Sequence, residues 1–336
     1  MQPTDFSKYL AAFLSKYLPA ERGASSNTIT SYRDTFILLI NYMESSGVKL
    51  SKLTLDKLNR ESIVNFLNWL QKERHASDAT RNIRLSAVHS FFKYLQYHDP
   101  QRLNYYQEVM GIPMKKTAHK TMNYLTIEAI TLLLQQPDTR TTKGRRDLAL
   151  LSLMYDIGAR VQEIIDLTPS YVRVDKPSTI KVIGKGNKAR IIPMLDGQVK
   201  LLKEYMVENK LTDPGTNLYP LFFNNKHEKL TRAGINYILS KYVAMASNKN
   251  SKLFPEHISC HSLRHSKAMH LLQAGVNLVY IRDILGHVSI TTTEVYARVD
   301  SKKKREAIET AYVQTAPKEM PSWLKSDNLL KWLKSF

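Results

Sequence analysis

Hydrophobic residues recur at helical spacing through most of this chain. In the first third they do so in DFSKYLAAFLSKYL, TITSYRDTFILLINYM, SIVNFLNWLQKERH and ATRNIRLSAVHSFFKYLQ. Because residues three and four positions apart share one face of a helix, this pattern predicts four helices, with Asn27 or Thr28 capping the second. Basic and hydroxyl residues lie opposite the apolar stripe of the second and fourth helices. That face fits either ordinary solvation or contact with a polyanion.

The pattern weakens between residues 106 and 123, where MGIPMKKTAHKTMN holds a glycine, a proline and several lysines. Helical spacing resumes in TIEAITLLLQQ and RRDLALLSLMYDIGA, and STIKVIG and ARIIPM predict two strands joined by the turn GKGNK. Helices follow to the C-terminus. We therefore expect a mainly α protein with a small β-hairpin. Its expected parts are a helical domain at 1–105, a basic linker at 106–123, a second domain at 124–315 and a tail helix at 316–336.

Composition narrows the possible partners. The chain has 336 residues, of which 43% are hydrophobic, and 49 Lys and Arg against 30 Asp and Glu give a net charge of +19. Such a balance favours a polyanion as partner, and anionic membranes attract the same surface. No stretch reaches the length of about 18 apolar residues that a membrane span requires, and no secretory signal is evident. The single cysteine, Cys260, suits a reducing cytosol, so we expect a cytoplasmic protein without a membrane association.

The segment from His261 to Val299 gathers the residue types that phosphate chemistry needs. It reads HSLRHSKAMHLLQAGVNLVYIRDILGHVSITTTEVYARV. Arg264 is a permanent cation with a planar set of donors that fits phosphate oxygens. His261 and His287 donate hydrogen bonds or move protons near neutral pH. Tyr296 carries a hydroxyl that can form a covalent intermediate, so the segment predicts phosphoryl transfer to tyrosine.

The motif H-x-x-R-H, then L-G-H, then a tyrosine nine positions on, resembles the tyrosine recombinases, the phage integrase family that includes the Xer proteins. The resemblance implies an upstream arginine and a lysine in a β-hairpin, which Arg160 in YDIGARVQEIIDL and Lys185 in TIKVIGKGNKARIIPM supply. It extends to the N-terminal helices, which resemble the family's DNA-binding core-binding domain, followed by the catalytic domain. One departure is Ile157, where many relatives have a threonine before the glycine.

The resemblance implies a role for each of these residues. Arg160 would bind a non-bridging oxygen of the scissile phosphate, and His261 and Arg264 would contact the same phosphate. His287 would approach the phosphate after Gly286. Lys185 would reach the minor groove and protonate the leaving 5′-oxygen, with Lys188 as the competing candidate. The family commonly has an acid at the position of Glu163, which either orients an arginine or a histidine or is a solvated glutamate. The lysines expected to contact DNA are Lys115, Lys116, Lys120 and Lys188.

Other chemistries fit these residues less well. His261 and His265 are four apart on one helix face and could ligate zinc, but Ser262 stands where the zinc-protease signature has glutamate. We expect no metal and no cofactor, and a structural role for His265. GKGNK lacks the P-loop pattern. Cys260 beside His261 is either a catalytic thiol or a small buried side chain, and we expect the second.

The tail predicts how copies of the chain associate. SWLKSDNLLKWLKSF holds Trp323 and Trp332, and Leu329, Leu333 and Phe336 share one helix face. A helix packed on its own domain and a membrane-surface helix are alternatives to docking into a neighbouring subunit, which the resemblance favours. We therefore expect a homotetramer on double-stranded DNA that performs site-specific recombination through a 3′-phosphotyrosine and a Holliday junction. Its biological task would be integration and excision of a mobile element or dimer resolution. The alternatives are a type IB topoisomerase and a non-catalytic architectural DNA-binding protein.

Overall fold

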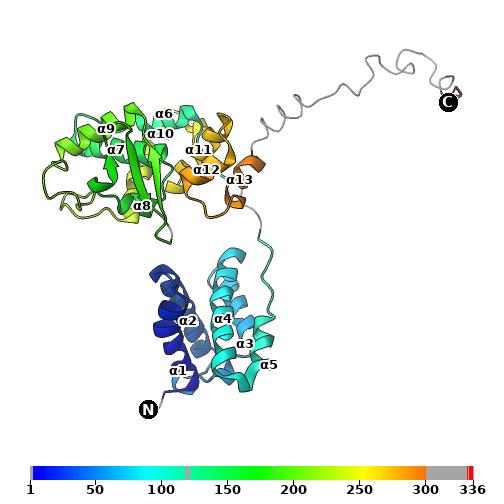
Figure 1. Ribbon diagram of the computed structural model, residues 1–336. Coiled ribbons are helices and arrows are strands. Elements are labelled where there is room, and N and C mark those ends of the chain that lie inside the picture. Colours follow the sequence, from blue (N-terminus) through cyan, green and yellow to red (C-terminus); the bar gives the residue numbers. More distant parts are fainter. Residues whose placement is uncertain (1–2, 118–121, 185, 300–330, 332, 336) are drawn as a thin grey trace. The chain divides into compact units, whose positions relative to one another are not determined.

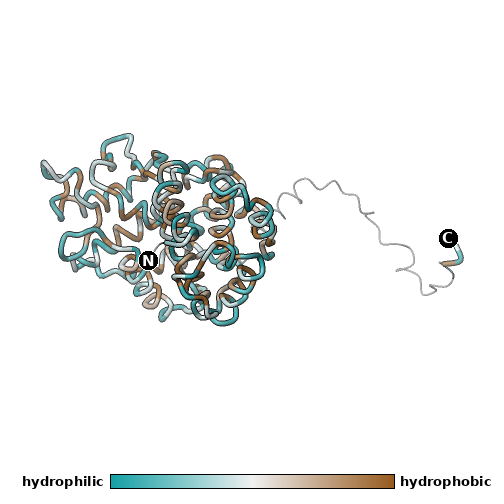
Figure 2. The backbone as a smooth tube through the Cα atoms, turned by 90° about the horizontal axis from the view of Figure 1, so that it is seen from below, coloured by the Kyte–Doolittle hydropathy of each residue, from teal (hydrophilic) through white to brown (hydrophobic). Residues whose placement is uncertain are grey.

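The computed structural model divides into two compact units, residues 1–120 and 121–336 (Figure 1). It describes residues 3–117, 122–184, 186–299, 331 and 333–335. Both units are built mainly of helices, and hydrophobic and hydrophilic positions alternate along them (Figure 2). Of the residues singled out above, Lys120, Lys185, Trp323, Leu329, Trp332 and Phe336 lie outside the described ranges. None of the helices in those ranges is both long and apolar enough to cross a membrane.

The first unit is a helical bundle, and the four helices expected there are confirmed. Its elements are α1 (Asp5–Ala12), the π-helical η1 (Phe13–Glu21), α2 (Ser26–Ser45), the 3-10 turns η2 (Leu50–Lys52) and η3 (Leu55–Lys57), α3 (Arg60–Lys72), α4 (Asp78–His98), the 3-10 turn η4 (Pro100–Arg102) and α5 (Leu103–Met110). The predicted cap of the second helix is wrong by two residues or more. Ser25 caps α2, because its side chain accepts a hydrogen bond from the backbone N–H of Thr28.

Aromatic packing fills the centre of this bundle. Phe91 of α4 is fully buried and meets the rings of Phe13 at 5.3 Å, Phe36 at 5.1 Å and Phe6 at 6.0 Å between centroids, all edge to face. Edge-to-face pairs add to the stabilisation from apolar burial because the ring quadrupoles attract in this geometry. Phe91 therefore joins α1, η1 and α2 to α4.

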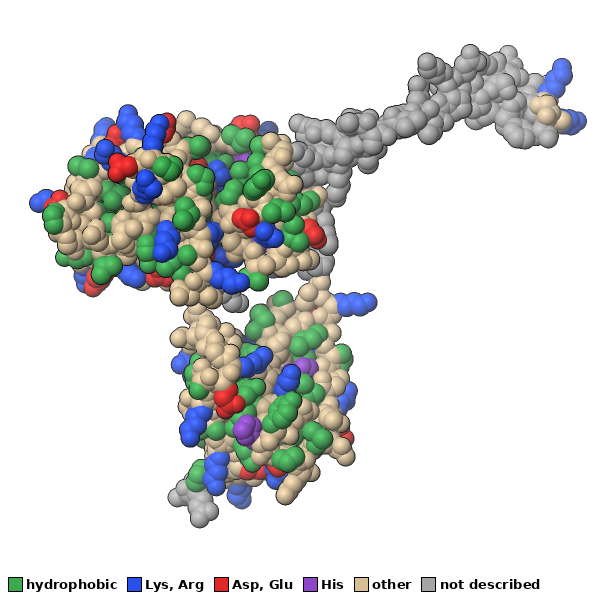
Figure 3. Space-filling model, viewed as in Figure 1, with side chains coloured by type: hydrophobic (Ala, Val, Ile, Leu, Met, Phe, Trp, Pro, Cys, Tyr) green, Lys and Arg blue, Asp and Glu red, His purple; other side chains and the backbone are tan. Residues whose placement is uncertain are grey.

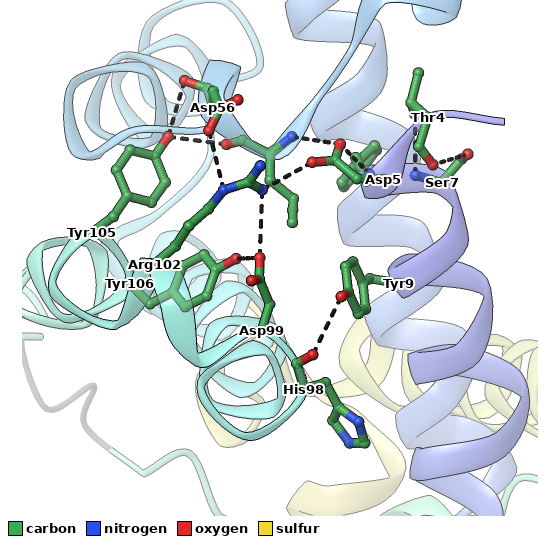
Figure 4. A network of polar contacts seen from close by, with 12 residues as sticks. Thr4, Asp5, Ser7, Tyr9, Asp56, His98, Asp99, Arg102, Tyr105 and Tyr106 are labelled. Carbon is green, nitrogen blue, oxygen red and sulfur yellow. Dashed lines mark hydrogen bonds and ion pairs between the residues drawn. The ribbon is translucent and has the colours of Figure 1, made fainter.

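Arg102 forms a network of ion pairs at one end of the same bundle (Figure 4). Its guanidinium lies 2.9 Å from Asp5 of α1, 3.5 Å from Asp56 of η3 and 3.4 Å from Asp99 after α4. The hydroxyl of Tyr106 donates to Asp99 at 2.6 Å. One half-exposed cation thus joins three segments that are distant in sequence.

The expected linker at 106–123 begins too early. Helix α5 runs to Met110, and Tyr106, Val109 and Ile112 are buried in the core of the first unit. This segment is short and polar residues interrupt its few apolar positions, so the sequence pattern did not predict a helix. Beyond it, the side-chain amide of Asn82 holds Lys115, donating to its carbonyl at 2.8 Å and accepting from its N–H at 3.0 Å. The first unit therefore fixes the chain as far as Lys115.

The second unit contains a three-stranded antiparallel sheet. Its helices are α6 (Ile127–Leu134), α7 (Thr142–Asp156), α8 (Val161–Ile165), the 3-10 turn η5 (Pro169–Tyr171), α9 (Asp196–Glu208), α10 (Arg232–Lys249), the 3-10 turn η6 (Ser251–Leu253), α11 (Cys260–Gln273), α12 (Leu278–Leu285) and α13 (Thr291–Val299). Where the chain enters the second unit, the backbone N–H of Leu125 donates a hydrogen bond to the hydroxyl of Ser266 at 2.8 Å.

The predicted hairpin is confirmed. Strands β2 (Thr179–Ile183) and β3 (Ala189–Pro193) pair antiparallel, and a short β1 (Val172–Arg173), which the sequence did not predict, pairs with β2. Ile180 and Ile192 are paired and buried, whereas Ile191 is 70% exposed. Alternate residues of a strand point to opposite faces, so one face of the hairpin packs on the core and Arg190 shares that face with Ile192.

Replacing Phe91 by alanine should destabilise the first unit by about 3–5 kcal/mol, because the cavity would lie at the point where four segments meet. Tyr97 is the matched control on the same helix, since it is 77% exposed. Tyr97→Ala should change the free energy of unfolding by no more than about 0.5 kcal/mol. Urea denaturation followed by tryptophan fluorescence, to which Trp69 contributes the signal of this unit, measures both. Equal losses in the two variants would contradict a core centred on Phe91.

Candidate active site

Arg160 is presented by a sharp turn between α7 and α8. Gly158 adopts φ +55°, and a Cβ added there would lie 2.7 Å from Leu285 of α12, so the turn needs glycine. Arg160 then caps α8, and its backbone N–H donates to the Glu163 carboxylate at 2.9 Å. Its guanidinium donates to the same carboxylate at 2.8 Å and to the carbonyl of Gly286 at 3.3 Å. The side chain is thereby aimed at the junction of α12 and α13.

Arg264 on α11 lies at the centre of this region and is only 3% exposed. It donates to the carbonyl of Gly158 and to the carbonyl of Leu285, both at 2.7 Å. Among the described residues, its hydrogen-bond partners are these two carbonyls, and no carboxylate forms an ion pair with it. Burial, with a further contribution from the nearby charge of Arg160, lowers the pKa of Arg264 to about 10. The site therefore holds a charged group whose desolvation an incoming anion would offset.

Glu163 is the one carboxylate that neutralises this cluster within the described chain. It accepts from Arg190 at 2.7 and 3.1 Å, as well as from Arg160. Burial on its own would raise the pKa of this carboxyl, but the bonds and charge of Arg190, followed by those of Arg160, bring it below its usual value. Glu163 is therefore in contact with two arginines and is not a solvated glutamate.

Arg190 is a site residue that sequence reasoning missed. Its Nε donates to the carbonyl of Ile284, so it connects β3 to the end of α12 while it holds Glu163. A Cβ on Gly286, which adopts φ +65°, would lie 2.8 Å from the Arg190 guanidinium. The alternation of side chains along β3 could have predicted this position. Arg190 lies two positions before the buried Ile192, so the two side chains share one face of the strand.

The histidines of the motif lie close to the guanidinium groups. His287, one residue after Gly286, makes a 2.9 Å hydrogen bond between Nδ1 and the hydroxyl of Thr293. Burial, followed by the charges of Arg264 and Arg160, lowers the pKa of His287 to about 4. The same three causes lower the pKa of His261. Both imidazoles are therefore neutral near pH 7 in the protein alone.

Tyr296 on α13 completes the arrangement. It is 2% exposed and packs with Met269 of α11 and Leu285 of α12 in a small apolar cluster. Its ring lies parallel to that of His287, with 6.3 Å between centroids, and its hydroxyl is 3.0 Å from Nδ1 of His265. Burial raises the pKa of Tyr296, while the charges of Arg264 and Arg160 oppose the rise. The phenol is thus within electrostatic range of both guanidiniums.

Five of the six predicted catalytic side chains therefore come together in the second unit: Arg160, His261, Arg264, His287 and Tyr296. The sixth, Lys185, lies outside the described residues. Its neighbour Lys188 is exposed and lines a cleft of about 390 Å³ together with Arg190 and His287.

The lysines expected to contact DNA have different surroundings. Lys115 belongs to the first unit, where its Nζ lies 2.7 Å from the Gln71 side-chain oxygen and 3.7 Å from Asp78. Lys116 is exposed, and Lys120 is outside the described ranges.

Cys260 is a buried thiol whose side-chain contact lies outside the motif. Burial raises the pKa of the Cys260 thiol to about 11, and its Sγ lies 2.9 Å from the side-chain oxygen of Asn236, where it donates a weak hydrogen bond. It is the small buried side chain that we expected. In the ranges that the structure describes, no group of three or more His, Cys, Asp or Glu side chains is arranged to hold a metal ion.

Comparison with known proteins decides the family. Residues 123–303 match the model of the phage integrase family, and residues 10–98 match the phage integrase N-terminal SAM-like domain. The chain belongs to the phage integrase family. It is 35% identical to the integrase/recombinase y4rC of Sinorhizobium fredii over 97% of both chains. It is also 32% identical to tyrosine recombinase XerD of Listeria innocua, covering 86% of this chain and 94% of the relative.

Solved structures of tyrosine recombinases have the same fold. XerH bound to a palindromic difH substrate matches with a TM-score of 0.69 and 23% identity, covering 89% of this chain and 84% of the other. The Tn1549 transposon integrase in complex with transposon right end DNA matches with a TM-score of 0.68 and 16% identity, covering 90% and 98%. The two helical units of this recombinase are therefore the SAM-like and catalytic domains of the family.

The buried histidines make the catalytic unit sensitive to acid. The pKa values of His265 and His287 are about 4 in the folded protein, against an ordinary value of 6.5. Between these values the unfolded chain binds more protons, so the stabilisation is complete above about pH 6.5 and is lost as the pH falls towards 4. Calorimetry should show a Tm at about pH 5 well below that at about pH 7.5.

His287→Gln should reduce this difference, since glutamine does not titrate. The exposed His257, changed to glutamine, is the matched control and should leave the difference unchanged. An equal effect of the two substitutions would argue against burial of His287 as the cause.

Proposed function

We propose that this tyrosine recombinase cuts and rejoins DNA strands at specific sites with Tyr296 as nucleophile. The observation that carries the proposal is Arg264, a guanidinium that is 3% exposed and whose hydrogen-bond partners among the described residues are two carbonyls. A phosphodiester is an anion whose oxygens fit the donors of arginine. The phenol of Tyr296 lies in range of this cation and of Arg160. A strand phosphate bound here would therefore meet a nucleophile.

In the proposed reaction, the Tyr296 oxygen attacks the phosphorus and the bond to the 5′-oxygen breaks. The 3′-phosphate remains on the tyrosine and the 5′-hydroxyl leaves with a proton. Fixed donors act where charge develops in the transition state, and they need no reorganisation as the reaction proceeds. Arg160, Arg264, His261 and His287 have this role, and Glu163 with Arg190 keeps Arg160 in position. Attack by a 5′-hydroxyl of another strand reverses the step, and exchange in two stages passes through a Holliday junction.

Double-stranded DNA is the substrate that the charge supports. The chain carries +19, and Lys and Arg side chains are spread over the face shown in Figure 3. Counterion release on phosphate contact makes such a surface favour a duplex. The matched XerH and Tn1549 structures hold DNA substrates. Lys116, Lys120 and Lys188 are the proposed phosphate contacts, and Lys115 is a weaker candidate because Gln71 and Asp78 already engage it.

We also propose that the tail at 316–336 docks into a neighbouring copy, in a homotetramer on DNA. The second unit offers an apolar pocket of about 180 Å³ lined by Ile192, Met194, Leu271 and Ile284, among others. Gln198 also lines it and has a buried side-chain N–H group without a partner among the described residues. An apolar helix end with a free backbone carbonyl suits such a pocket. Leu333, the tail leucine that the structure describes, is 56% exposed in the single chain.

Tyr296→Phe should abolish covalent attachment and keep DNA binding, because it removes the nucleophilic oxygen and little volume. A nicked suicide substrate carrying the recombination site should trap a protein–3′-phosphate adduct with the wild type. An adduct with Tyr296→Phe, seen by denaturing electrophoresis, would show that another residue is the nucleophile.

Arg264→Ala should lower the cleavage rate by roughly 10²–10³-fold, as loss of one fixed charge donor does.

Lys185→Ala should cut ordinary DNA slowly and cut a substrate with a 5′-bridging sulfur at nearly the wild-type rate. A thiolate leaves without needing the proton that Lys185 is proposed to supply. Lys188→Ala, in the same turn, is the matched control. Rescue of Lys188→Ala in place of Lys185→Ala would move the role of acid to Lys188.

Deleting residues 321–336 should leave binding to a single site nearly intact and weaken the synapse of two sites. Leu271→Lys, in the proposed acceptor pocket, should have the same effect, because it places a charge against an apolar segment. Leu218→Lys is the control, since Leu218 is 82% exposed. Native electrophoresis separates single-site complexes from synapses. Normal synapsis by both the deletion and Leu271→Lys would exclude docking through this pocket.

A further inference from the structure

His265 has a contact that makes it more than a packing residue. Its Nδ1 lies 3.0 Å from the hydroxyl of Tyr296, and the two ring centroids are 5.7 Å apart. The two residues come from different helices, α11 and α13, which pack on each other. His265 is thus the described side chain in hydrogen-bond contact with the proposed nucleophilic oxygen.

The surroundings of His265 keep its imidazole neutral. Burial, then the neighbouring His261 and Arg264 of the same helix, lowers the pKa of His265 to about 4. From the elements packed against α11, Tyr296 of α13 contacts His265, and His287 before α13 lies close enough for the two histidines to interact through their charges. A neutral imidazole has one ring nitrogen with a lone pair, which can accept a hydrogen bond or a proton.

We propose that His265 is a further catalytic residue, the proton acceptor for Tyr296. The inference rests on the proposed function, with Tyr296 as nucleophile. In the proposed tautomer Nε2 carries the proton and Nδ1 accepts the hydrogen bond from the phenol. As the Tyr296 oxygen bonds to phosphorus, its proton moves to Nδ1 and His265 becomes an imidazolium. The 5′-oxygen leaves with a proton from a different donor. On religation the imidazolium returns the proton to the phenol.

The bound phosphate would assist this transfer. The guanidinium charge of Arg264 opposes an imidazolium at His265, and a phosphodiester bound against that guanidinium partly cancels its effect. The acceptor is therefore weak in the free protein and strengthened when DNA is bound. A side chain in van der Waals contact alone would have no such dependence on the substrate.

His265→Asn is the informative variant, because the amide oxygen lies near the position of Nδ1 and accepts a hydrogen bond but does not take up a proton. The substrate is a suicide duplex with a 5′-bridging sulfur, in which the leaving group needs no proton. The wild-type cleavage rate should then be nearly constant from about pH 6 to about pH 8. His265→Asn should be about 10²-fold slower at about pH 6.5 and should rise up to about tenfold per pH unit, as hydroxide replaces the acceptor.

The same helix supplies a matched control. Nδ1 of His270 makes a 2.8 Å hydrogen bond with the hydroxyl of Tyr155, so His270→Asn alters a histidine–tyrosine pair outside the site. It should keep the wild-type rate and the flat pH profile. His265→Ala, which leaves space for a small base, should regain cleavage when imidazole is added.

The outcomes separate the inference from the function on which it rests. Absence of an adduct with the wild type would overturn the proposed role of Tyr296. A wild-type adduct, together with a His265→Asn rate that is unchanged or reduced by one factor at every pH, would overturn the role of His265 alone. So would the lack of any imidazole rescue in a His265→Ala protein that binds DNA normally.

Discussion

The two hydrogen bonds from Arg264 to backbone carbonyls are the interaction on which the rest of the site depends. One carbonyl belongs to Gly158 after α7 and the other to Leu285 at the end of α12. A buried guanidinium must have hydrogen-bond acceptors for its N–H groups, so the C-terminal ends of α7 and α12 both lie next to Arg264. Arg160 and His287 follow directly in sequence from those ends. The hydrogen bonds of Arg264 to backbone carbonyls therefore help to place the other proposed catalytic groups.

Several arginines lie together in the site, and among the described residues one carboxylate, that of Glu163, forms ion pairs with them. Glu163 forms ion pairs with Arg160 and Arg190, and among the described residues no carboxylate forms an ion pair with Arg264. The neighbouring histidines respond by remaining neutral, since their pKa values are lowered by burial and by these charges. In the free protein the site is thus under-neutralised. The proposed substrate supplies the missing anion, which links binding to the protonation of the histidines.

The sequence predicted the elements and motif positions well, because local spacing determines them. The helix-period pattern located α2, α3, α4 and α7, and strand alternation with a glycine turn located the hairpin. It did not predict contacts between distant residues. Arg190 and Glu163 are 27 positions apart, and His265 and Tyr296 are 31 apart. Nothing in the periodicity of α11 indicates which of its histidines meets α13, so His265 was expected to be structural. Helix α5 was missed because it is short and buries only a few residues.

The chain is anchored to a domain on either side of the unit boundary. Asn82 holds Lys115 in the first unit, and Ser266 holds Leu125 in the second. Ten residue steps separate these anchors, and a fully extended chain would span about 35 Å across them. On the proposed DNA substrate, the domain that binds first would keep the second within that distance of the duplex. For a tether of this length the effective local concentration is of millimolar order, so the two proposed contacts with DNA reinforce each other.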